Sequence, residues 1–336
     1  MKVSLKNIAD ALNLSKATVS WILSGQGEAK GFSEKTIKRV KDYAESVNYR
    51  PNLLARSLSL GTSNTLGLII PFLSDTFYGQ LAASIESEAT RNKYALIVCS
   101  SEGDGEKEFE LIKMLRSNQV DGLILAPTKV TRKGVDMLSK GVLPYVLVDR
   151  YYPNLESNYV IVNNSKSCYD VVYHIGKKGS KKIAILTTDM HLLVMKQRLE
   201  GYRNALQDLG HDIKLSLELF VNRAHYQTDI IDKLDILFQE EPDVDGFFFS
   251  THYLALEAIR YFIDHKIDYH RFHMGSFHDT PALDILAPEM CISRMPIDKL
   301  GFESVRILLD NIRNKETFSY QNIILDNEFY PTMQQR

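Results

Sequence analysis

The strongest constraint on this chain is an alternation of short apolar runs with amphipathic helical stretches along most of its length. The runs that have the length and composition of buried strands are Leu66–Pro71, Ala95–Ser100, Gly122–Ala126, Tyr145–Asp149, Lys182–Thr187, Gly246–Ser250 and His273–Ser276. The helical stretches between them include Gly79–Asn92, Glu106–Asn118, Ser165–Lys178 and Gln197–Leu209. Apolar strands alternating with helices are typical of parallel sheets covered on both faces. A break near Tyr159–Asn163 and a return near Ile292–Met295 indicate two doubly wound lobes joined by crossovers.

Residues 1–50 show helical spacing and no strand-like run. Three helices are predicted, each preceded by a serine that can cap it: Ser4 before Leu5–Leu12, Ser15 before Lys16–Leu23, and Ser33 before a helix with Ile37, Val40, Ala44 and Val47 on one face. On the second helix, Val19 and Leu23 are expected to point inward. Three short helices of this kind predict a helix-turn-helix domain, whose second helix enters the major groove of DNA.

The charge differs between the two parts of the chain. Residues 1–60 hold ten Lys and Arg against five Asp and Glu, a net +5, whereas the remainder holds 30 against 37, a net −7. A compact basic module supplies salt-sensitive attraction to phosphates, and an acidic body is kept off the duplex. This asymmetry favours DNA contact through the first sixty residues.

Composition and motifs argue against several other classes of protein. The chain has no apolar run of membrane-spanning length and no signal-like amino terminus, and its three scattered cysteines suit a reducing compartment, so a cytoplasmic protein is expected. No cofactor or metal site is expected, because the nine histidines lack ligand spacing. The segment Gly25–Gly31 imitates a phosphate loop, but no strand precedes it, and we expect a flexible loop there. An enzyme is not expected, because no nucleophile elbow or phosphate loop is present.

Motifs in order along the chain resemble the lactose repressor (LacI) family. They are Ala17-Thr-Val-Ser20, Tyr49-Arg-Pro-Asn52, Ala55-Arg-Ser-Leu58, Leu66–Pro71, Gln119–Leu125 and Arg198–Arg203. The resemblance covers almost the whole chain. It implies a multidomain fold, with a small all-α helix-turn-helix head and an α/β body of two doubly wound parallel-sheet lobes like type I periplasmic binding proteins. The implied division is residues 1–50 for the head, 51–61 for a hinge helix and linker, and 62–336 for effector binding and dimerisation.

The resemblance also implies two groups of DNA contacts. Those in the head are Ser4, Ser15, Lys16, Ala17, Thr18, Ser20 and Trp21, and those in the hinge are Asn52, Ala55, Arg56 and Leu58. Trp21 stands where the family often has Arg, and its indole suits a thymine methyl or a sugar edge; alternatively, it packs against the third helix or the partner head. Leu58 matches the side chain that wedges into the minor groove, although an ordinary linker helix is the alternative.

Polar and aromatic side chains follow the predicted strands, where a ligand between the lobes would lie. The predicted effector-binding residues are Asp75, Phe77, Ser100, Asp149, Arg150, Asn163, Arg198, Thr251, Tyr253, Phe277, His278 and Asp279. Carboxylates, amides and guanidinium groups hold sugar hydroxyls, and aromatic rings cover the apolar ring face. For some of these residues a structural role is the alternative, such as helix capping by Asp149 or Asn164, or an interlobe ion pair for Arg198. Thr251-His252 and His278 depart from the family pattern and favour an anionic or acceptor-rich ligand, although neutral imidazole also binds sugars.

The expected protein is therefore a ligand-responsive transcription regulator, in particular a repressor. We expect a homodimer on a pseudo-palindromic double-stranded operator, a carbohydrate effector and no membrane association. Residues 79–92 and 298–314 are the expected dimer faces. The alternatives are a sugar-binding module without regulation, and a regulator that responds to a nucleobase or another non-sugar ligand.

Overall fold

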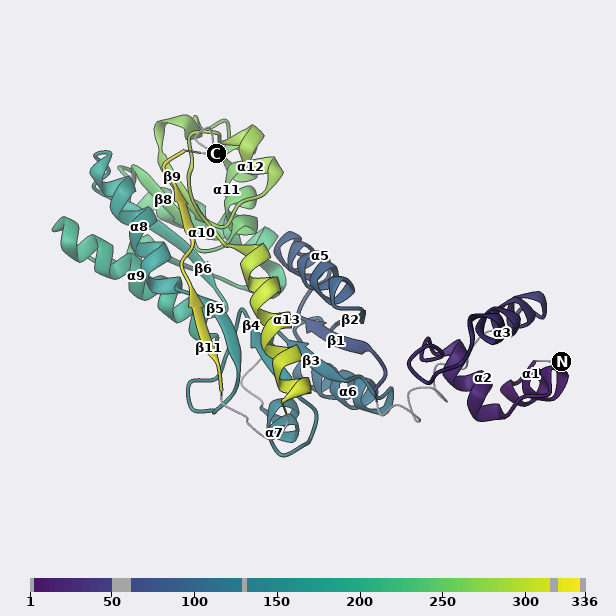
Figure 1. Ribbon diagram of the computed structural model, residues 1–336. Helices are drawn as coiled ribbons and strands as arrows, with labels where there is room; N and C mark the ends of the chain where they lie inside the picture. The colour runs from purple at the N-terminus through teal and green to yellow at the C-terminus, as the bar shows by residue number, and fades with distance from the viewer. Residues whose placement is uncertain (1–2, 50–61, 129–131, 315–319, 333–336) are drawn as a thin grey trace. The chain divides into compact units, whose positions relative to one another are not determined.

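The computed structural model describes residues 3–49, 62–128, 132–314 and 320–332. It divides into two compact units, Met1–Ser63 and Asn64–Arg336. Each unit has a hydrophobic core of its own. Figure 1 shows the helices and strands of both units.

The first unit holds three helices around a small core. They are α1 (Leu5–Leu12), α2 (Lys16–Leu23) and α3 (Glu34–Ser46). Ser4, Ser15 and Ser33 cap them as predicted, each accepting a hydrogen bond from a backbone N–H of the first turn. The residues buried in this core are Ile8, Ala9, Leu12, Val19, Ile22, Ile37, Val40 and Ala44.

Two details of this unit differ from the prediction. On α2, Leu23 packs against the core as predicted but is only half-buried. Ile22, which was not predicted, is fully buried with Val19, because a position three residues on also returns to the inward side of a helix. The segment Gly25–Gly31, expected to be flexible, is a series of hydrogen-bonded turns; Gln26 N donates to Trp21 O, and Phe32 N donates to Gly27 O. Gly27 is buried, and a Cβ there would lie 3.0 Å from the Ile37 side chain. Packing therefore orders the segment.

The second unit contains two six-stranded sheets. The first has the order β11-β5-β4-β3-β1-β2 and the second the order β12-β10-β9-β8-β6-β7. The strands of the first sheet are β1 (Thr65–Ile70), β2 (Ala95–Ser100), β3 (Gly122–Leu125), β4 (Tyr145–Val148), β5 (Tyr159–Val162) and β11 (Asn322–Leu325). Those of the second are β6 (Ile183–Thr188), β7 (Glu218–Val221), β8 (Gly246–Phe249), β9 (His273–Phe277), β10 (Cys291–Arg294) and β12 (Glu328–Tyr330).

Within the described residues, these strands pair in parallel except where β12 runs antiparallel to β10. The seven predicted strands are present, and each end lies within one residue of its predicted place. The chain crosses from the first sheet to the second after β5, returns after β10 and crosses again between β11 and β12. The predicted fold class, an all-α head with two doubly wound parallel-sheet lobes, is confirmed.

Helices cover both faces of each sheet (Figure 1). On the first sheet, α5 (Thr76–Arg91) and α13 (Ile297–Arg313) pack on one face, and α6 (Gly105–Ser117) and α7 (Lys133–Ser139) on the other. On the second, one face carries α8 (Asn164–Lys177) and α9 (Leu193–Leu209), and the other carries α10 (Tyr226–Glu240) and α11 (His252–Asp264), with α12 (Pro281–Leu286) packed beside α11. Among the residues that the structure describes, none of the helices combines the length and apolar character that crossing a membrane demands.

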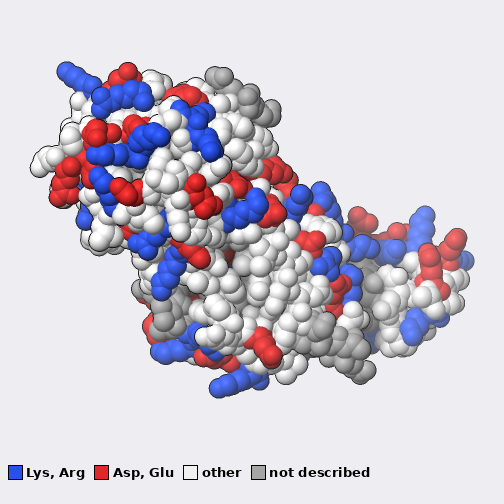
Figure 2. Space-filling model, turned by 90° about the vertical axis from the view of Figure 1, so that its left-hand side faces the viewer, with Lys and Arg blue, Asp and Glu red and all other residues white. Residues whose placement is uncertain are grey.

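The surface mixes charges of both signs. On the face drawn in Figure 2, basic and acidic side chains are interspersed over the upper part of the view, and neither sign gathers into one large patch. A face of this kind creates no strong electrostatic field of one sign.

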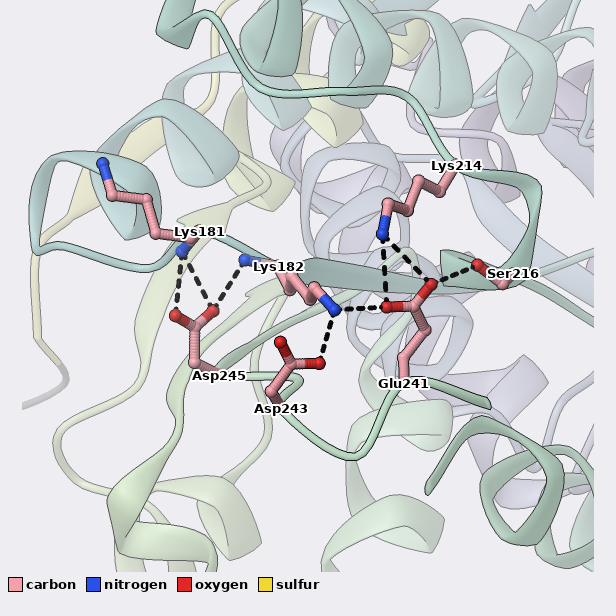
Figure 3. A network of polar contacts seen from close by, with 7 residues as sticks. All are labelled: Lys181, Lys182, Lys214, Ser216, Glu241, Asp243 and Asp245. Atoms are coloured by element: carbon pink, nitrogen blue, oxygen red, sulfur yellow. Dashed lines mark hydrogen bonds and ion pairs between the residues drawn. The ribbon is translucent and has the colours of Figure 1, made fainter. Parts of the chain in front are cut away.

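A network of ion pairs and hydrogen bonds connects the segments that lie just before β6, β7 and β8 of the second sheet (Figure 3). The Glu241 carboxylate, only 9% exposed, accepts hydrogen bonds from Lys182 Nζ at 2.6 Å and from Ser216 Oγ at 2.8 Å. Lys182 also contacts Asp243, and the Asp245 carboxylate accepts from the backbone N–H of Lys182 at 2.9 Å. Hydrogen bonds from Lys182 and Ser216 lower the pKa of Glu241 to about 2. The network therefore joins the segments that lead into β6, β7 and β8.

We predict that Glu241→Gln lowers the midpoint of urea unfolding at pH 7, because the replacement removes the charge that Lys182 and Lys214 face. The depressed pKa means that the contribution of Glu241 is fully present above its unfolded pKa and is lost as the pH falls from there toward about 2. The difference between wild type and variant should therefore shrink below about pH 4. Asp243→Asn is the matched control with a smaller expected effect, because the Asp243 side chain is 66% exposed. A difference that grows on acidification would contradict the assignment.

Candidate ligand-binding cleft and DNA-reading helix

The outward face of α2 presents the predicted DNA-contacting residues. Lys16 and Ala17 are exposed, and Ser20 is half-buried. Ser15 Oγ accepts from Thr18 N at 3.0 Å and lies 2.8 Å from the Thr18 hydroxyl, while Ser4 forms a capping box with Asn7. Ser4, Ser15 and Thr18 therefore shape the helix starts, and the α2 surface beside them is open. The hinge residues Asn52, Ala55, Arg56 and Leu58 lie outside the described residues.

Trp21 combines features of both interpretations of its role. Its ring stacks on Phe32, just before α3, with centroids 6.3 Å apart, and Lys30 Nζ lies 5.2 Å from the ring centre. The side chain nevertheless remains 40% exposed. Packing on Phe32 covers one side of the indole, and its exposed part lies on the outer side of α2, one helical turn from Ala17.

A cavity of about 60 Å³ lies between the two lobes of the second unit, where the carboxyl ends of strands from both sheets meet. We call it the inner cavity. The predicted effector-binding residues that line it are Asp75, Phe77, Asp149, Arg150, Arg198, Thr251, Tyr253, Phe277 and His278. Residues outside the predicted set also line it, namely Phe72, Tyr78, Asp189, Val194, Met195, Arg223, His252 and Met295. The expectation that polar side chains gather after the ends of the strands therefore located the cavity and identified about half of the residues that line it.

Three predicted residues do not line the inner cavity, because each side chain turns to a local partner. Ser100 Oγ donates to the backbone oxygen of Pro71 at 3.1 Å. Asn163 caps α8, accepting from Lys166 N at 3.2 Å. Asp279 accepts from Arg294 Nε and Nη2 at 3.1 and 2.7 Å. Because all three residues lie at or just after the end of a strand, the sequence predicted the correct edge of the sheet for each. It did not predict the direction in which each side chain points.

Arg198 is the most enclosed cation of the cavity. Its Nε donates to Asn164 Oδ1 at 2.8 Å, and its Nη1 donates to Ser250 O at 2.7 Å. The guanidinium lies 3.5 Å above the Phe277 ring and is 5% exposed as a residue. No carboxylate among the described residues lies within ion-pair distance, and burial lowers the pKa of Arg198. The interlobe ion pair considered for Arg198 is therefore not formed; its hydrogen-bond partners are neutral and belong to the second lobe.

Asp149 forms a buried polar cluster on the side of the first lobe. The Tyr78 hydroxyl donates to Asp149 Oδ2 at 2.7 Å, and Arg150 Nε lies 3.5 Å from the same oxygen. Burial raises the pKa of Tyr78 well above its ordinary value, so the phenol stays protonated and acts as the donor. Asp149 does not cap a helix, and its backbone is left-handed, with φ of 65°. This conformation turns the chain after β4 so that Asp149 and Arg150 both face the cavity.

Charged groups meet across the cleft at Asp75, which also caps α5. Arg223 Nη2 lies 3.8 Å from Asp75 Oδ2, and His252 Nε2 lies 3.9 Å from Asp75 Oδ1. The Arg223 guanidinium stacks on Tyr253, 4.0 Å from the ring centre. Sequence reasoning missed Arg223, because it sits in a short 3-10 turn (Arg223–His225) after β7, a strand that was not predicted. Asp75 of the first lobe therefore faces Arg223 and His252 of the second across the inner cavity.

His278 lines the inner cavity with a buried imidazole. It is 3% exposed, and neither ring nitrogen has a hydrogen-bond partner among the described residues. Burial lowers its pKa to about 3, so the imidazole is neutral at physiological pH. A neutral imidazole offers one donor and one acceptor, which suits a hydroxyl group. The described residues contain no group of three or more His, Cys, Asp or Glu arranged to hold a metal ion.

Comparison with known proteins gives two family matches. Residues 4–52 match the family described as bacterial regulatory proteins, lacI family, and residues 63–252 match the periplasmic binding proteins and sugar binding domain of LacI family. The second match alone covers more than half of the chain.

Individual proteins match over nearly the whole length. Catabolite control protein A of Priestia megaterium is 28% identical over 320 residues, covering 94% of both chains. The ribose operon repressor of Halalkalibacterium halodurans is 27% identical over 324 residues, covering 95% of this chain and 93% of its own length. The crystal structure of the lac repressor dimer bound to operator and the anti-inducer ONPF superposes with a TM-score of 0.83 at 19% identity, covering 99% of both chains. The matched relatives are regulators, not enzymes.

We predict that the ring carbon signals of His278, followed by NMR, do not titrate between about pH 5 and pH 8. Because its folded pKa is depressed, the stability contribution of the neutral imidazole is present above the unfolded pKa and is lost as the pH falls below it. His278→Gln assigns the signal and retains one donor and one acceptor. A titration midpoint near neutrality would show that water reaches the ring.

Proposed function

The chain belongs to the LacI family of bacterial regulatory proteins, and on that premise we propose that it is a repressor whose operator affinity is controlled by a carbohydrate held between its lobes. The observation that carries the proposal is the inner cavity, where carboxylate, guanidinium, imidazole and aromatic side chains converge from both lobes. Such sets hold hydroxyl groups and the apolar face of a sugar ring. The basic first sixty residues supply the attraction to phosphate.

The contacts at Asp75 support a mechanism for the ligand response. A ligand can change DNA affinity only if it binds two arrangements of the lobes with different free energies. Asp75 lies on the first lobe, and Arg223 and His252 lie on the second, so their spacing changes whenever the lobes move. The inner cavity, at about 60 Å³, has room for only a few waters, so a sugar requires the lobes or side chains to shift. We propose that this shift reaches the DNA through the hinge residues Asn52–Leu58.

We propose a homodimer on a pseudo-palindromic operator, in the cytoplasm, with residues 1–50, 51–61 and 62–336 as its functional divisions. Of the two predicted dimer faces, α13 is largely covered by its own chain. It packs so closely on α5 that a Cβ at Gly301 would lie 2.2 Å from Ser84 Oγ. The outward side of α5, with Gln80 and Ala83 exposed, borders a groove of about 800 Å³. That side of α5 is the better candidate for the partner.

The DNA proposal predicts that the purified chain retards a fragment of its own upstream DNA, and that a responsive sugar changes the retardation. Leu58→Ala should weaken operator binding by about tenfold or more, because loss of a wedge removes the contacts that offset unstacking. Its affinity for the sugar should change far less. Equal losses of DNA and sugar affinity would contradict the wedge role, and an absence of sequence-specific retardation under every condition would refute the regulator proposal.

The ligand proposal predicts that Arg198→Met raises the sugar concentration needed for the response by about tenfold or more, because hydrogen bonds to a charged group are worth about 1.5–3 kcal/mol. Titration calorimetry and gel retardation measure the two effects. Lys196→Met on the same helix is the matched control, because Lys196 is exposed and does not line the inner cavity. Tightest binding of a purine in the same panel would refute the carbohydrate proposal.

A further inference from the structure

A second and larger cavity adjoins the inner one between the lobes. We call it the outer cavity. Its volume is about 270 Å³, against about 60 Å³ for the inner cavity. Arg150 and Val194 line both, so the two spaces are neighbours in the cleft. The outer cavity is bounded by the segment after β4 on the first lobe, with Tyr151 and Tyr152, and by the residues around the start of α9 on the second, with Leu192 and Leu193.

Among the residues that the structure describes, most of those lining the outer cavity are apolar or aromatic. Pro127, Tyr151 and Tyr152 line it on the first lobe, and Leu192 and Leu193 line it on the second. A few polar groups accompany them, among them Asn154 and His191. Binding sites for uncharged organic ligands have this composition, with apolar walls and a few groups that fix orientation.

The arginines of the outer cavity are already neutralised. Arg132 Nη2 lies 3.1 Å from Asp136 Oδ1, and Arg150 Nε lies 3.5 Å from Asp149 Oδ2. Both carboxylates therefore offset the positive charge before any ligand arrives. A phosphate or carboxylate group would gain little net attraction there and would also meet Leu192 and Leu193. An uncharged ring with hydroxyl groups on its rim fits these surroundings better.

Buried polar contacts hold the first-lobe wall in shape. The Glu108 carboxylate, 2% exposed as a residue, accepts from Thr128 N at 2.8 Å, and Arg150 Nη1 donates to the backbone oxygen of Pro127 at 3.2 Å. The guanidinium of Arg132 lies 5.8 Å from the centre of the Tyr152 ring. The wall is thus formed before a ligand binds, which reduces the ordering cost of binding.

We propose that the outer cavity is a subsite for a second sugar ring, so that the effector is an uncharged disaccharide or longer glycoside and not a free monosaccharide. This inference rests on the proposed function of the inner cavity. One ring reaches the inner cavity, and the next lies between the tyrosines of the first lobe and the leucines of the second. A ligand that contacts both lobes at two places distinguishes lobe arrangements better than one that contacts them once.

The first test is a competition among uncharged mono- and disaccharides, hexose 6-phosphates and purines for the purified full-length protein, followed by native mass spectrometry and calorimetry. The expected result is a disaccharide that binds at least about tenfold more tightly than either constituent monosaccharide. The inference is overturned if a monosaccharide binds as tightly as every disaccharide that contains it, or if a sugar phosphate binds best. Either result would still be consistent with a regulator that responds to a carbohydrate. Binding of a purine alone, or of none of the compounds, overturns the inference and counts against the proposed carbohydrate effector itself.

The second test fills or empties the outer cavity. Leu193→Trp places a bulky ring at the start of α9, and Tyr152→Ala removes a ring from the opposite wall. Each is expected to lower disaccharide affinity at least about tenfold more than affinity for the corresponding monosaccharide. Tyr173→Ala is the matched control: this tyrosine stacks on Tyr169 on α8 and lines neither cavity, so both affinities should keep their wild-type values. Equal loss of both affinities in Leu193→Trp, with unfolding midpoints like that of wild type, overturns the subsite.

Discussion

The structure of the second unit depends on one constraint, the repeated crossing of the chain between two parallel sheets. Because β1, β4, β6, β8 and β9 all end at the cleft, the side chains that follow them meet there although they lie far apart in the sequence. The final crossing between β11 and β12 ties the lobes again near the end of the described chain. The lobes can therefore move relative to each other only by bending a few connecting segments.

Within the cleft, the two lobes contribute different chemistry. The first lobe provides a carboxylate held by a phenol and a guanidinium, in Tyr78, Asp149 and Arg150. The second lobe provides Arg198, which is held by neutral partners and lies on Phe277. A ligand with hydroxyl groups can accept from one side and donate to the other. A ligand that uses both sides would bind the possible lobe arrangements with different affinities, which the proposed response to a ligand requires.

The sequence indicated most of the fold but less of the cleft. The buried strands stood out because strands covered on both faces are apolar throughout. Five strands, β5, β7, β10, β11 and β12, were not predicted as strands. The edge strands β7, β11 and β12 carry exposed positions, so no continuous apolar run marks them, and the sequence marked β5 and β10 only as the break and the return between the lobes. Nine of the twelve predicted cleft residues line the inner cavity, and their part in ligand binding stays a prediction.

The sequence by itself determined the serine caps, the helical head, the α/β alternation and the edge of the sheets at which polar side chains would gather. All of these follow from local chemistry or from periodicity along the chain. Only the tertiary structure decided which of those side chains turn into the cleft: Asn163 turns to cap α8 and Asp279 turns to Arg294, whereas Arg223 reaches across to Asp75. It also decided that the larger space lies beside Tyr151 and Leu193. Side-chain direction and cavity volume depend on packing between distant segments, which no local pattern records.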